Sequence, residues 1–432
     1  MSRKQSNRFV WLVGFALLIA IAVLVACGTT YKQGTDGLVL VGSQGSAVIQ
    51  TFSFGLANGH IASVFNSTND TGSETCALPG QPASMLLDPT GTYAYVILEA
   101  TAPCAGSQFG IQGFQVNSDG TLKAVGSVTP DPNPTPNPVA MTMDSKGQFL
   151  FVAEGVNALI DVYSISSGNL TPVGGFATPS VSNAPFAPNL VALAITPTVF
   201  PAPVNDVNLA ECSSIPPPTA EYLYTVDQEN YLVWMFTVNT STGALTPFVA
   251  QTSQGAMNPF LTDPVPAGIA VDACNRFVYV TANQNNKVDA FTMCNGSTTE
   301  STLCTSVPQP AGYLEPVTGS PFSMPGTVVG PGPLVVDPYG NQLYVISTSN
   351  NLTTFHISQN GPPGSLTPGN PSVVSTGQGA TAIAIRSDDN WLFVTNYLGA
   401  TISQYSITQS TGAVTSYPPT ATDNYPFGVA VK

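Results

Sequence analysis

The chain is poor in positive charge. Only 10 of its 432 residues are Lys or Arg, against 24 Asp or Glu, and the formal net charge is −14. Three of the bases, Arg3, Lys4 and Arg8, lie in an N-terminal leader, so the rest carries 7 bases against 24 acids, a net charge of −17 (7 − 24). Nucleic acid binding relies on Lys and Arg side chains that neutralise phosphates. This shortage therefore excludes nucleic acid as a partner, and it argues against any ligand recognised through a cluster of bases.

Catalytic motifs are also missing. The sequence contains no G-x-S-x-G elbow, no H-E-x-x-H motif, no P-loop and no Gly-rich dinucleotide fingerprint. It has only two histidines, His60 and His356, and we expect both to be surface or strand residues rather than catalytic bases. A Ser-His-Asp triad therefore has almost no candidates to draw on.

One long hydrophobic run is present, and it lies at the N-terminus. It extends from Phe9 to Ala26 behind the basic residues and ends in the letters L-V-A-C at Cys27. This is the layout of a secretory signal peptide. The L-V-A-C letters resemble the lipobox of bacterial lipoproteins, in which the cysteine is diacylated and the chain is cut before it. A transmembrane anchor is the alternative, because the run is just long enough to span a bilayer.

The residues around Cys27 favour the lipoprotein. Ala26 is small and a polar stretch follows the cysteine. We therefore expect residues 1–26 to be the signal peptide and residues 27–37 to be a lipidated, flexible tether. The acylated Cys27 would anchor the protein in a lipid bilayer of the bacterial cell envelope. Gly28 rather than Asp follows it, which by resemblance to the usual sorting pattern favours the outer membrane.

The remaining cysteines form an even set. The chain has seven, and six remain once Cys27 is acylated: Cys76, Cys104, Cys212, Cys274, Cys294 and Cys304. An even number in an exported protein predicts disulfides. No C-x-x-C pair occurs and no histidine is close to a cysteine in sequence, which argues against a zinc site.

A repeat runs through the rest of the chain. Each copy has a small apolar strand, a tight turn, a strand with a central aromatic, and a third strand with another aromatic about twelve residues later. The clearest turn-and-strand copies are DPTGTYAYV (88–96), DSKGQFLFV (144–152), DACNRFVYV (272–280) and DPYGNQLYV (337–345). Four short strands per unit, repeated at about 50 to 70 residues, describe a blade of a β-propeller.

The two ends of the chain complete the ring. Six units are whole, and the seventh is divided between PFGVAVK at the C-terminus and GLVLVGSQGSAVIQTFSF near the N-terminus. Pairing these ends leaves no exposed sheet edge. We therefore predict an all-β fold, a single seven-bladed β-propeller over residues 38–432, with the aromatics packed between blades. Four recurring acids are expected to accept backbone N–H groups in their turns rather than to bind metal: Asp88, Asp144, Asp272 and Asp337.

Short phrases in these strands carry a family resemblance. FVTN at 393–396, YVTAN at 279–283 and VTGSPF at 317–322 resemble the YVTN-type repeats of the lactonase-like seven-bladed propeller family, which includes 6-phosphogluconolactonases. The similarity covers roughly residues 38–432. The shared residues are strand and turn residues, so the resemblance implies the fold and says little about function.

The resemblance also implies which loops share a face. In such propellers the connections from fourth to first strand and from second to third strand lie on one face, here called the top. The other turns lie on the opposite face, the bottom. Cys76 and Cys104 then share the top, and we predict that they pair. The other four cysteines share the bottom, where two arrangements remain open: Cys274–Cys294 with Cys212–Cys304, or Cys294–Cys304 with Cys212–Cys274.

Acids and amides recur at the top edge, just after the second strand. Glu99, Glu154 and Asp227 occupy this position in consecutive blades, with Glu229 close by, and these three acids are the candidates for catalysis. Corresponding positions elsewhere hold Asn283, Ser347 and Asn396, of which the two amides are candidates for binding. Such a partial ring could hold a divalent cation, polarise a water, or hydrogen-bond a sugar or lactone. The simpler expectation is that the acids are solvated loop carboxylates.

Two functions fit these observations. The one we expect is an envelope-anchored, monomeric binding scaffold that presents disulfide-pinned loops to a protein or a glycan. The alternative, implied by the family resemblance, is a lactone hydrolase acting on a sugar lactone, with a divalent cation as the one cofactor that the acids suggest. A phosphorylated lactone fits poorly, because Arg276 and Arg386 are the only arginines outside the leader and both fall in bottom turns.

Lipidation can be tested on Cys27. We expect Cys27→Ala to leave the chain unprocessed by the lipoprotein signal peptidase and unlabelled by a palmitate analogue, because no thiol remains to be acylated. Metabolic labelling followed by gel fluorescence measures this. Normal labelling of the variant would contradict the lipoprotein assignment.

Overall fold

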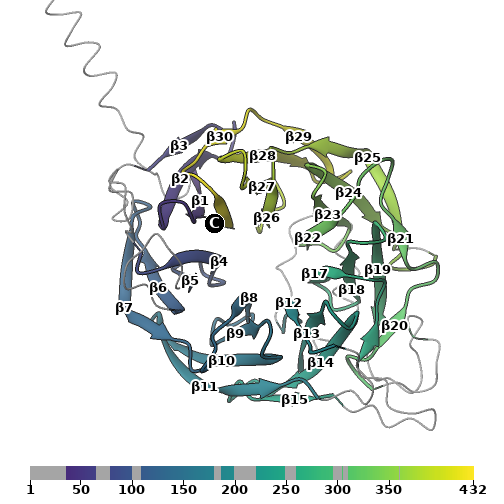
Figure 1. Cartoon of the computed structure of the whole chain (residues 1–432). Helices are drawn as coiled ribbons and strands as arrows, with labels where there is room; N and C mark the ends of the chain where they lie inside the picture. Colours follow the sequence, from purple (N-terminus) through teal and green to yellow (C-terminus); the bar gives the residue numbers. More distant parts are fainter. Residues whose placement is uncertain are drawn as a thin grey trace, which may run out of the picture.

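The computed structural model describes residues 36–64, 78–99, 109–179, 186–198, 220–248, 259–294, 304, 310–359 and 361–432. These residues form strands in seven sheets that surround a central axis like the blades of a propeller (Figure 1). Each blade has a path of four antiparallel strands from the axis outward, and three blades add a short fifth strand that pairs with the third strand of the path. In the described ranges no helix is long and apolar enough to cross a membrane. The predicted all-β, seven-bladed propeller is confirmed.

We number the blades I to VII along the chain and give their strands from the axis outward. Blade I contains β31 (Pro426–Val431), β1 (Asp36–Ser43), β2 (Val48–Gly55) and β3 (Ile61–Ser63). Blade II contains β4 (Gln81–Leu87), β5 (Tyr93–Glu99), β6 (Gly110–Val116) and β7 (Leu122–Pro130). Blade III contains β8 (Pro138–Met143), β9 (Phe149–Glu154), β10 (Leu159–Ser166) and β11 (Asn169–Ala177). Blade IV contains β12 (Leu190–Ile195), β13 (Glu221–Asp227), β14 (Leu232–Val238) and β15 (Leu245–Pro247), with β16 (Phe260–Leu261). Blade V contains β17 (Pro266–Val271), β18 (Phe277–Ala282), β19 (Lys287–Met293) and β20 (Leu314–Pro316), with β21 (Phe322–Ser323). Blade VI contains β22 (Pro331–Val336), β23 (Gln342–Ser347), β24 (Asn351–Ile357) and β25 (Leu366–Ser375). Blade VII contains β26 (Ala380–Ile385), β27 (Trp391–Asn396), β28 (Thr401–Thr408), β29 (Ala413–Ser416) and β30 (Thr420–Ala421).

The first and last segments of the chain close the ring in blade I. Strand β31 pairs antiparallel with β1, with Val431 opposite Val39 and Val429 opposite Val41. The register continues beyond the strand, where Leu38 and Lys432 exchange two backbone hydrogen bonds. Figure 1 shows the yellow C-terminal strand beside the purple N-terminal ones. The divided blade predicted from the sequence is therefore confirmed.

The aromatic side chains of the second strands join neighbouring blades. Tyr279 of blade V is fully buried, and its hydroxyl donates to the carbonyl of Gly364 in the outer turn of blade VI at 3.1 Å. Gly364 has a left-handed backbone (φ +82°), and a Cβ there would lie 2.5 Å from the Phe277 ring, so the turn requires glycine. The same bond recurs between Tyr224 and Gly312 and between Tyr344 and Gly412. The prediction that these aromatics form the core between blades is confirmed.

The recurring aspartates of the bottom turns also have the predicted role. In blade III, Asp144 Oδ1 accepts the N–H groups of Gln148 and Phe149, each at 2.6 Å. The equivalent carboxylates accept backbone N–H groups in the same way: Asp88 from Tyr93, Asp272 from Cys274, and Asp337 from Asn341. These bonds fix the tight connection from the inner to the second strand, so the interpretation of these aspartates as turn residues is confirmed.

Blade VII departs from this turn. Arg386 stands where the turns of blades II, III, V and VI have Asp, and Asp389 stands where those turns have Gly or Asn in a left-handed conformation (φ +55° at Asp389). The Asp389 side chain is fully buried, and neither carboxylate oxygen has a hydrogen-bond partner among the described residues. Burial, reinforced by the charge of Asp337, raises the pKa of Asp389 to about 8. Burial raises the pKa of Asp337 to about 7, against the opposing effect of its backbone hydrogen bonds.

These two carboxyl groups predict a pH dependence of stability. Between about pH 4 and pH 8 the folded state holds protons that the unfolded chain has released, so the free energy of unfolding falls as pH rises. We expect Asp389→Asn to raise Tm by several degrees at pH 8 and to change it little at pH 5. Thermal unfolding at both pH values, followed by circular dichroism, measures this. Asp119→Asn, at an exposed acid of another bottom turn, is the control, and an unchanged pH dependence in Asp389→Asn would contradict the assignment.

Candidate functional site

The innermost strands of all seven blades line a central cavity of about 350 Å³. Its walls are small and apolar, made by residues such as Ala83, Val139, Ala192 and Gly428. Ser84 and Thr381 supply the hydroxyl groups, and no titratable side chain contributes to the lining. This cavity can therefore enclose a small ligand, but it offers no acid or base to transform one.

The acids and amides predicted at the top edge share one register. Glu99, Glu154, Asp227, Ser347 and Asn396 are each the last residue of the second strand of their blade. Each lies opposite the first residue of the inner strand, for example Glu154 opposite Pro138. Asn283 is one residue beyond this register, which in blade V is held by Ala282 opposite Pro266. The placement of Asn283 in one register with Ser347 and Asn396 was therefore wrong by one residue, and the Asn283 side chain donates to the carbonyl of Pro331 instead.

Two of the three acids, Glu154 and Asp227, are not solvated loop carboxylates, so that expectation was wrong for them. Glu154 and Asp227 have no exposed surface. Asp227 accepts the N–H groups of Asn189 and Asn230 through Oδ1, at 3.1 and 3.3 Å, and the Asn230 amide through Oδ2 at 2.9 Å. Glu229 is exposed as expected, and Glu99 is half-buried.

A shared structural role explains this burial. The loop that enters each inner strand carries N–H groups that need an acceptor away from water. Glu154 Oε2 accepts from Asn137 N at 2.8 Å, and Asn396 Oδ1 accepts from Gly377 N at 2.9 Å. In blades I and V a residue of the third strand does the same, where Gln50 binds Asp423 N and Asp289 binds Asp263 N. The candidate binding residue Asn396 is thus buried and fully engaged within its own blade.

Glu99 is the exception among the three candidate acids. It ends β5 of blade II and keeps part of its surface exposed. Burial of the remainder raises its pKa above the ordinary glutamate value. A partly exposed carboxylate with a raised pKa is suited to take a proton from water, so Glu99 is the one candidate able to contact a substrate without rearrangement.

Glu154 belongs to a group of three carboxylates. Asp131, from the loop between β7 and β8, and Asp161, from β10, place oxygens within 4.8 Å of each other and of a Glu154 oxygen. Burial raises the pKa of Glu154 to about 8, and the two aspartates add to this effect. Burial also raises the pKa of Asp161 to about 6. Sequence reasoning missed both aspartates, although an acid inside the apolar strand LIDVYS was a visible signal.

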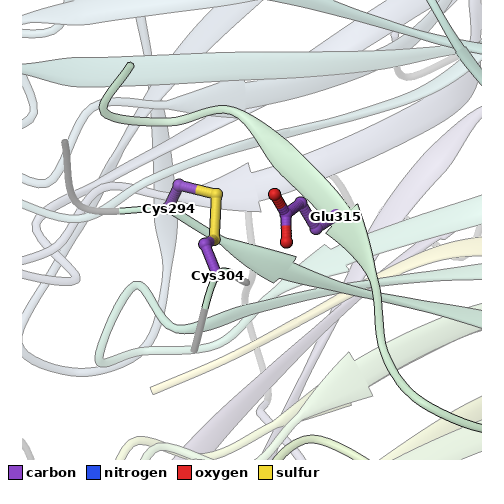
Figure 2. A group of neighbouring side chains, drawn as sticks. All are labelled: Cys294, Cys304 and Glu315. Carbon is purple, nitrogen blue, oxygen red and sulfur yellow. A yellow bond between two sulfur atoms is a disulfide. The ribbon is translucent and has the colours of Figure 1, made fainter. Parts of the chain in front are cut away.

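In a second group of potential metal ligands, the two cysteines are joined by a disulfide. Cys294 and Cys304 lie beside Glu315, but Figure 2 shows the two sulfur atoms bonded to each other. Metal binding requires thiolates, so this group is a structural link and not a metal site. The bond, with a Cα–Cα distance of 5.6 Å, joins the end of β19 to the segment that precedes β20.

This disulfide decides between the two arrangements left open for the bottom cysteines. Cys294–Cys304 is present, so the rival that paired Cys274 with Cys294 is excluded. Cys274 is also disulfide-bonded. Cys212 remains its predicted partner. Cys212, Cys76, Cys104 and Cys27 lie outside the described residues, so the predicted Cys76–Cys104 disulfide and the predicted lipidation of Cys27 stay predictions.

Positive charge is sparse at the top of the described chain. Lys287, the first residue of β19, is the one basic side chain there, and its Nζ lies 3.6 Å from Asp263 Oδ2. The remaining described bases belong to bottom turns or strand ends: Lys123, Lys146, Arg276, Arg386 and Lys432. Arg276 is buried and paired with Asp272 at 2.6 Å. His60 is exposed in a bottom turn and His356 lies in β24, as expected.

The structural role of the top acids can be tested at Asp227. Asp227→Ala removes the acceptor of two backbone N–H groups and of one side-chain amide, so it should cost about 1–3 kcal/mol of unfolding free energy. Glu229→Ala, two residues away and exposed, should change it by less than about 0.5 kcal/mol. Urea denaturation of both variants measures the difference. Equal, small effects would mean that Asp227 does not hold the loop.

Comparisons with known proteins agree with this architecture. Among solved structures, a candidate 6-phosphogluconolactonase from Bacteroides fragilis matches with a TM-score of 0.64 and 17% identity, over 92% of this chain and 98% of that one. The periplasmic gluconolactonase PpgL of Pseudomonas aeruginosa matches with a TM-score of 0.62 and 16% identity, over 92% and 99%. At such identities the likeness shows the fold alone, and no curated protein sequence matches the chain. The model of the family described as lactonase, 7-bladed beta-propeller, matches residues 39–176 and 321–424, and the chain belongs to that family.

Proposed function

We propose that this protein is an exported, lipid-anchored lactonase that hydrolyses an uncharged sugar lactone. Its membership of the lactonase propeller family supports the reaction class. The gluconolactonase of Pseudomonas aeruginosa, which shares the fold, is described as periplasmic, so this activity occurs in an exported protein of the same architecture. Anchoring through Cys27 in the cell envelope rests on the sequence.

The distribution of charge carries the choice of an uncharged substrate. A phosphorylated lactone would need a cluster of Arg or Lys beside the reacting carbonyl. Among the described residues, the top face holds Lys287 alone, and that side chain lies against Asp263. Both arginines outside the leader are ion-paired in bottom turns. A neutral aldonolactone requires no such cluster.

Glu99 is our candidate for the general base. Its carboxylate would take a proton from a water molecule as the oxygen of that water attacks the lactone carbonyl carbon. The bond from this carbon to the ring oxygen then breaks, and the ring oxygen leaves as a hydroxyl group by taking the proton that Glu99 holds, which returns Glu99 to its carboxylate form. The product is the open-chain hydroxy acid. The raised pKa of Glu99 favours the proton transfer in the first step.

A binding scaffold is the second candidate. The observation that favours it is the central cavity, whose lining contains no titratable group. A rigid propeller with such a cavity could hold a ligand or present its loops to a protein or a glycan without catalysis.

Hydrolysis of glucono-δ-lactone, followed in a pH-stat and corrected for the buffer blank, separates the two candidates. We expect turnover above the blank, and a loss of about a hundredfold or more in Glu99→Gln, because a general base contributes about that much. Glu229→Gln, at an exposed acid of the same face, should keep full activity. Turnover no faster than buffer would favour the scaffold, and full activity of Glu99→Gln would remove Glu99 as the base.

A further inference from the structure

Of the three carboxylates at the top of blade III, Asp131 is partly exposed, whereas Glu154 and Asp161 are buried without enough donors to satisfy them. Glu154 and Asp161 are 0% and 2% exposed. Asn133 donates to Asp131 Oδ1 and Asp161 Oδ2, and Asn137 N donates to Glu154 Oε2. Glu154 Oε1 and Asp161 Oδ1 are buried and have no hydrogen-bond partner. Buried carboxylate oxygens normally have partners, so these two atoms require an explanation.

In blade V, a lysine lies near the acids at the equivalent position. Asp289 occupies the register of Asp161, since the two lie opposite Val280 and Val152 in equivalent strand pairs. There Asp289 accepts the N–H of Asp263, and Lys287 lies 3.6 Å from the Asp263 carboxylate. The local charge is therefore offset by a lysine.

Blade III lacks this lysine and has an additional acid. The first residue of its third strand is Leu159, where blade V has Lys287, and the residue opposite is Glu154, where blade V has Ala282. In the described part of the chain, none of the three carboxylates forms an ion pair with Lys, Arg or His. Three acids thus converge where a positive charge is missing.

We propose that Asp131, Glu154 and Asp161 form a binding site for a divalent cation, and that Ca²⁺ is the cation they fit. Ca²⁺ binds oxygen ligands at about 2.3–2.6 Å, so ligand atoms on opposite sides of it are about 4.8 Å apart. The three oxygens lie within 4.8 Å of one another, so no pair of them is too far apart for both atoms to bind the same Ca²⁺. The group contains no His or Cys, which Zn²⁺ and copper prefer.

The bound ion would tie a loop to two strands of its blade. Asp131 belongs to the segment that leads into β8, whereas Glu154 and Asp161 belong to β9 and β10. Since β8 contributes Val139 and Ala140 to the central cavity, the ion would fix the top of one wall. This proposal is independent of the lactonase activity, because its readout is binding and stability.

Calcium titration of the full-length protein in detergent tests the site. After removal of metal with a chelator, isothermal titration with CaCl2 should show one site per chain with a Kd at or below about 1 mM. The same CaCl2 should raise Tm by several degrees, and KCl of equal ionic strength should not. No saturable binding by the wild type, or an equal Tm shift in KCl, would overturn the proposal.

Variants identify the ligands. Glu154→Gln and Asp161→Asn each remove one charged ligand, and we expect Ca²⁺ affinity to fall at least about tenfold in both. Asp289→Asn, at the equivalent position of blade V, should bind Ca²⁺ as the wild type does. Unchanged affinity in Glu154→Gln and Asp161→Asn would overturn the assignment. The wild-type titration remains decisive if one variant does not fold.

Discussion

The pairing of β31 with β1 is the interaction on which the rest of the structure depends. A propeller blade buries its two faces against its neighbours, so every blade needs one on each side. Without the C-terminal strand, blade I would lack its innermost member, and the apolar faces of blades II and VII would lose the part of their cover that β31 provides. The hydrogen bonds between Leu38 and Lys432 and the apolar contacts of Val429 therefore stabilise the whole ring rather than one sheet.

Ring closure imposes a second requirement at the top face. Each inner strand is reached by a loop that descends from the rim, and its N–H groups leave solvent as the blades pack together. A polar side chain at the end of the second strand or near the start of the third meets this need in several blades, as Asp227, Asn396 and Gln50 show. The acids that first suggested catalysis are thus mostly part of the scaffold. Blade III is distinct because it has more carboxylates than this role uses.

The same separation of scaffold and site bears on function. The residues that repeat from blade to blade in this chain are buried aromatics and turn aspartates, and these make the fold without specifying a reaction. Contact with a ligand depends instead on the loops and the few accessible polar groups at the top, including Glu99. The scarcity of basic side chains on that face limits the substrates that can be held there. Charge therefore says more about the ligand of this chain than its fold does.

Much of the architecture was determined by the sequence itself. Alternating apolar residues, aromatics about twelve positions apart and Asp turns are local patterns with one structural solution, and the divided repeat required the ends to meet. The sequence could not reveal that Glu154 and Asp227 are buried. Both acids end a strand next to a loop, a position that is usually exposed, and they are buried here because the loop that enters the inner strand folds over them. It also left two disulfide arrangements open, since pairing depends on distances between turns. Only the tertiary structure brought Asp131 and Asp161 to Glu154, because residues separated along the chain become neighbours only when the strands of a blade and the loop above them pack together.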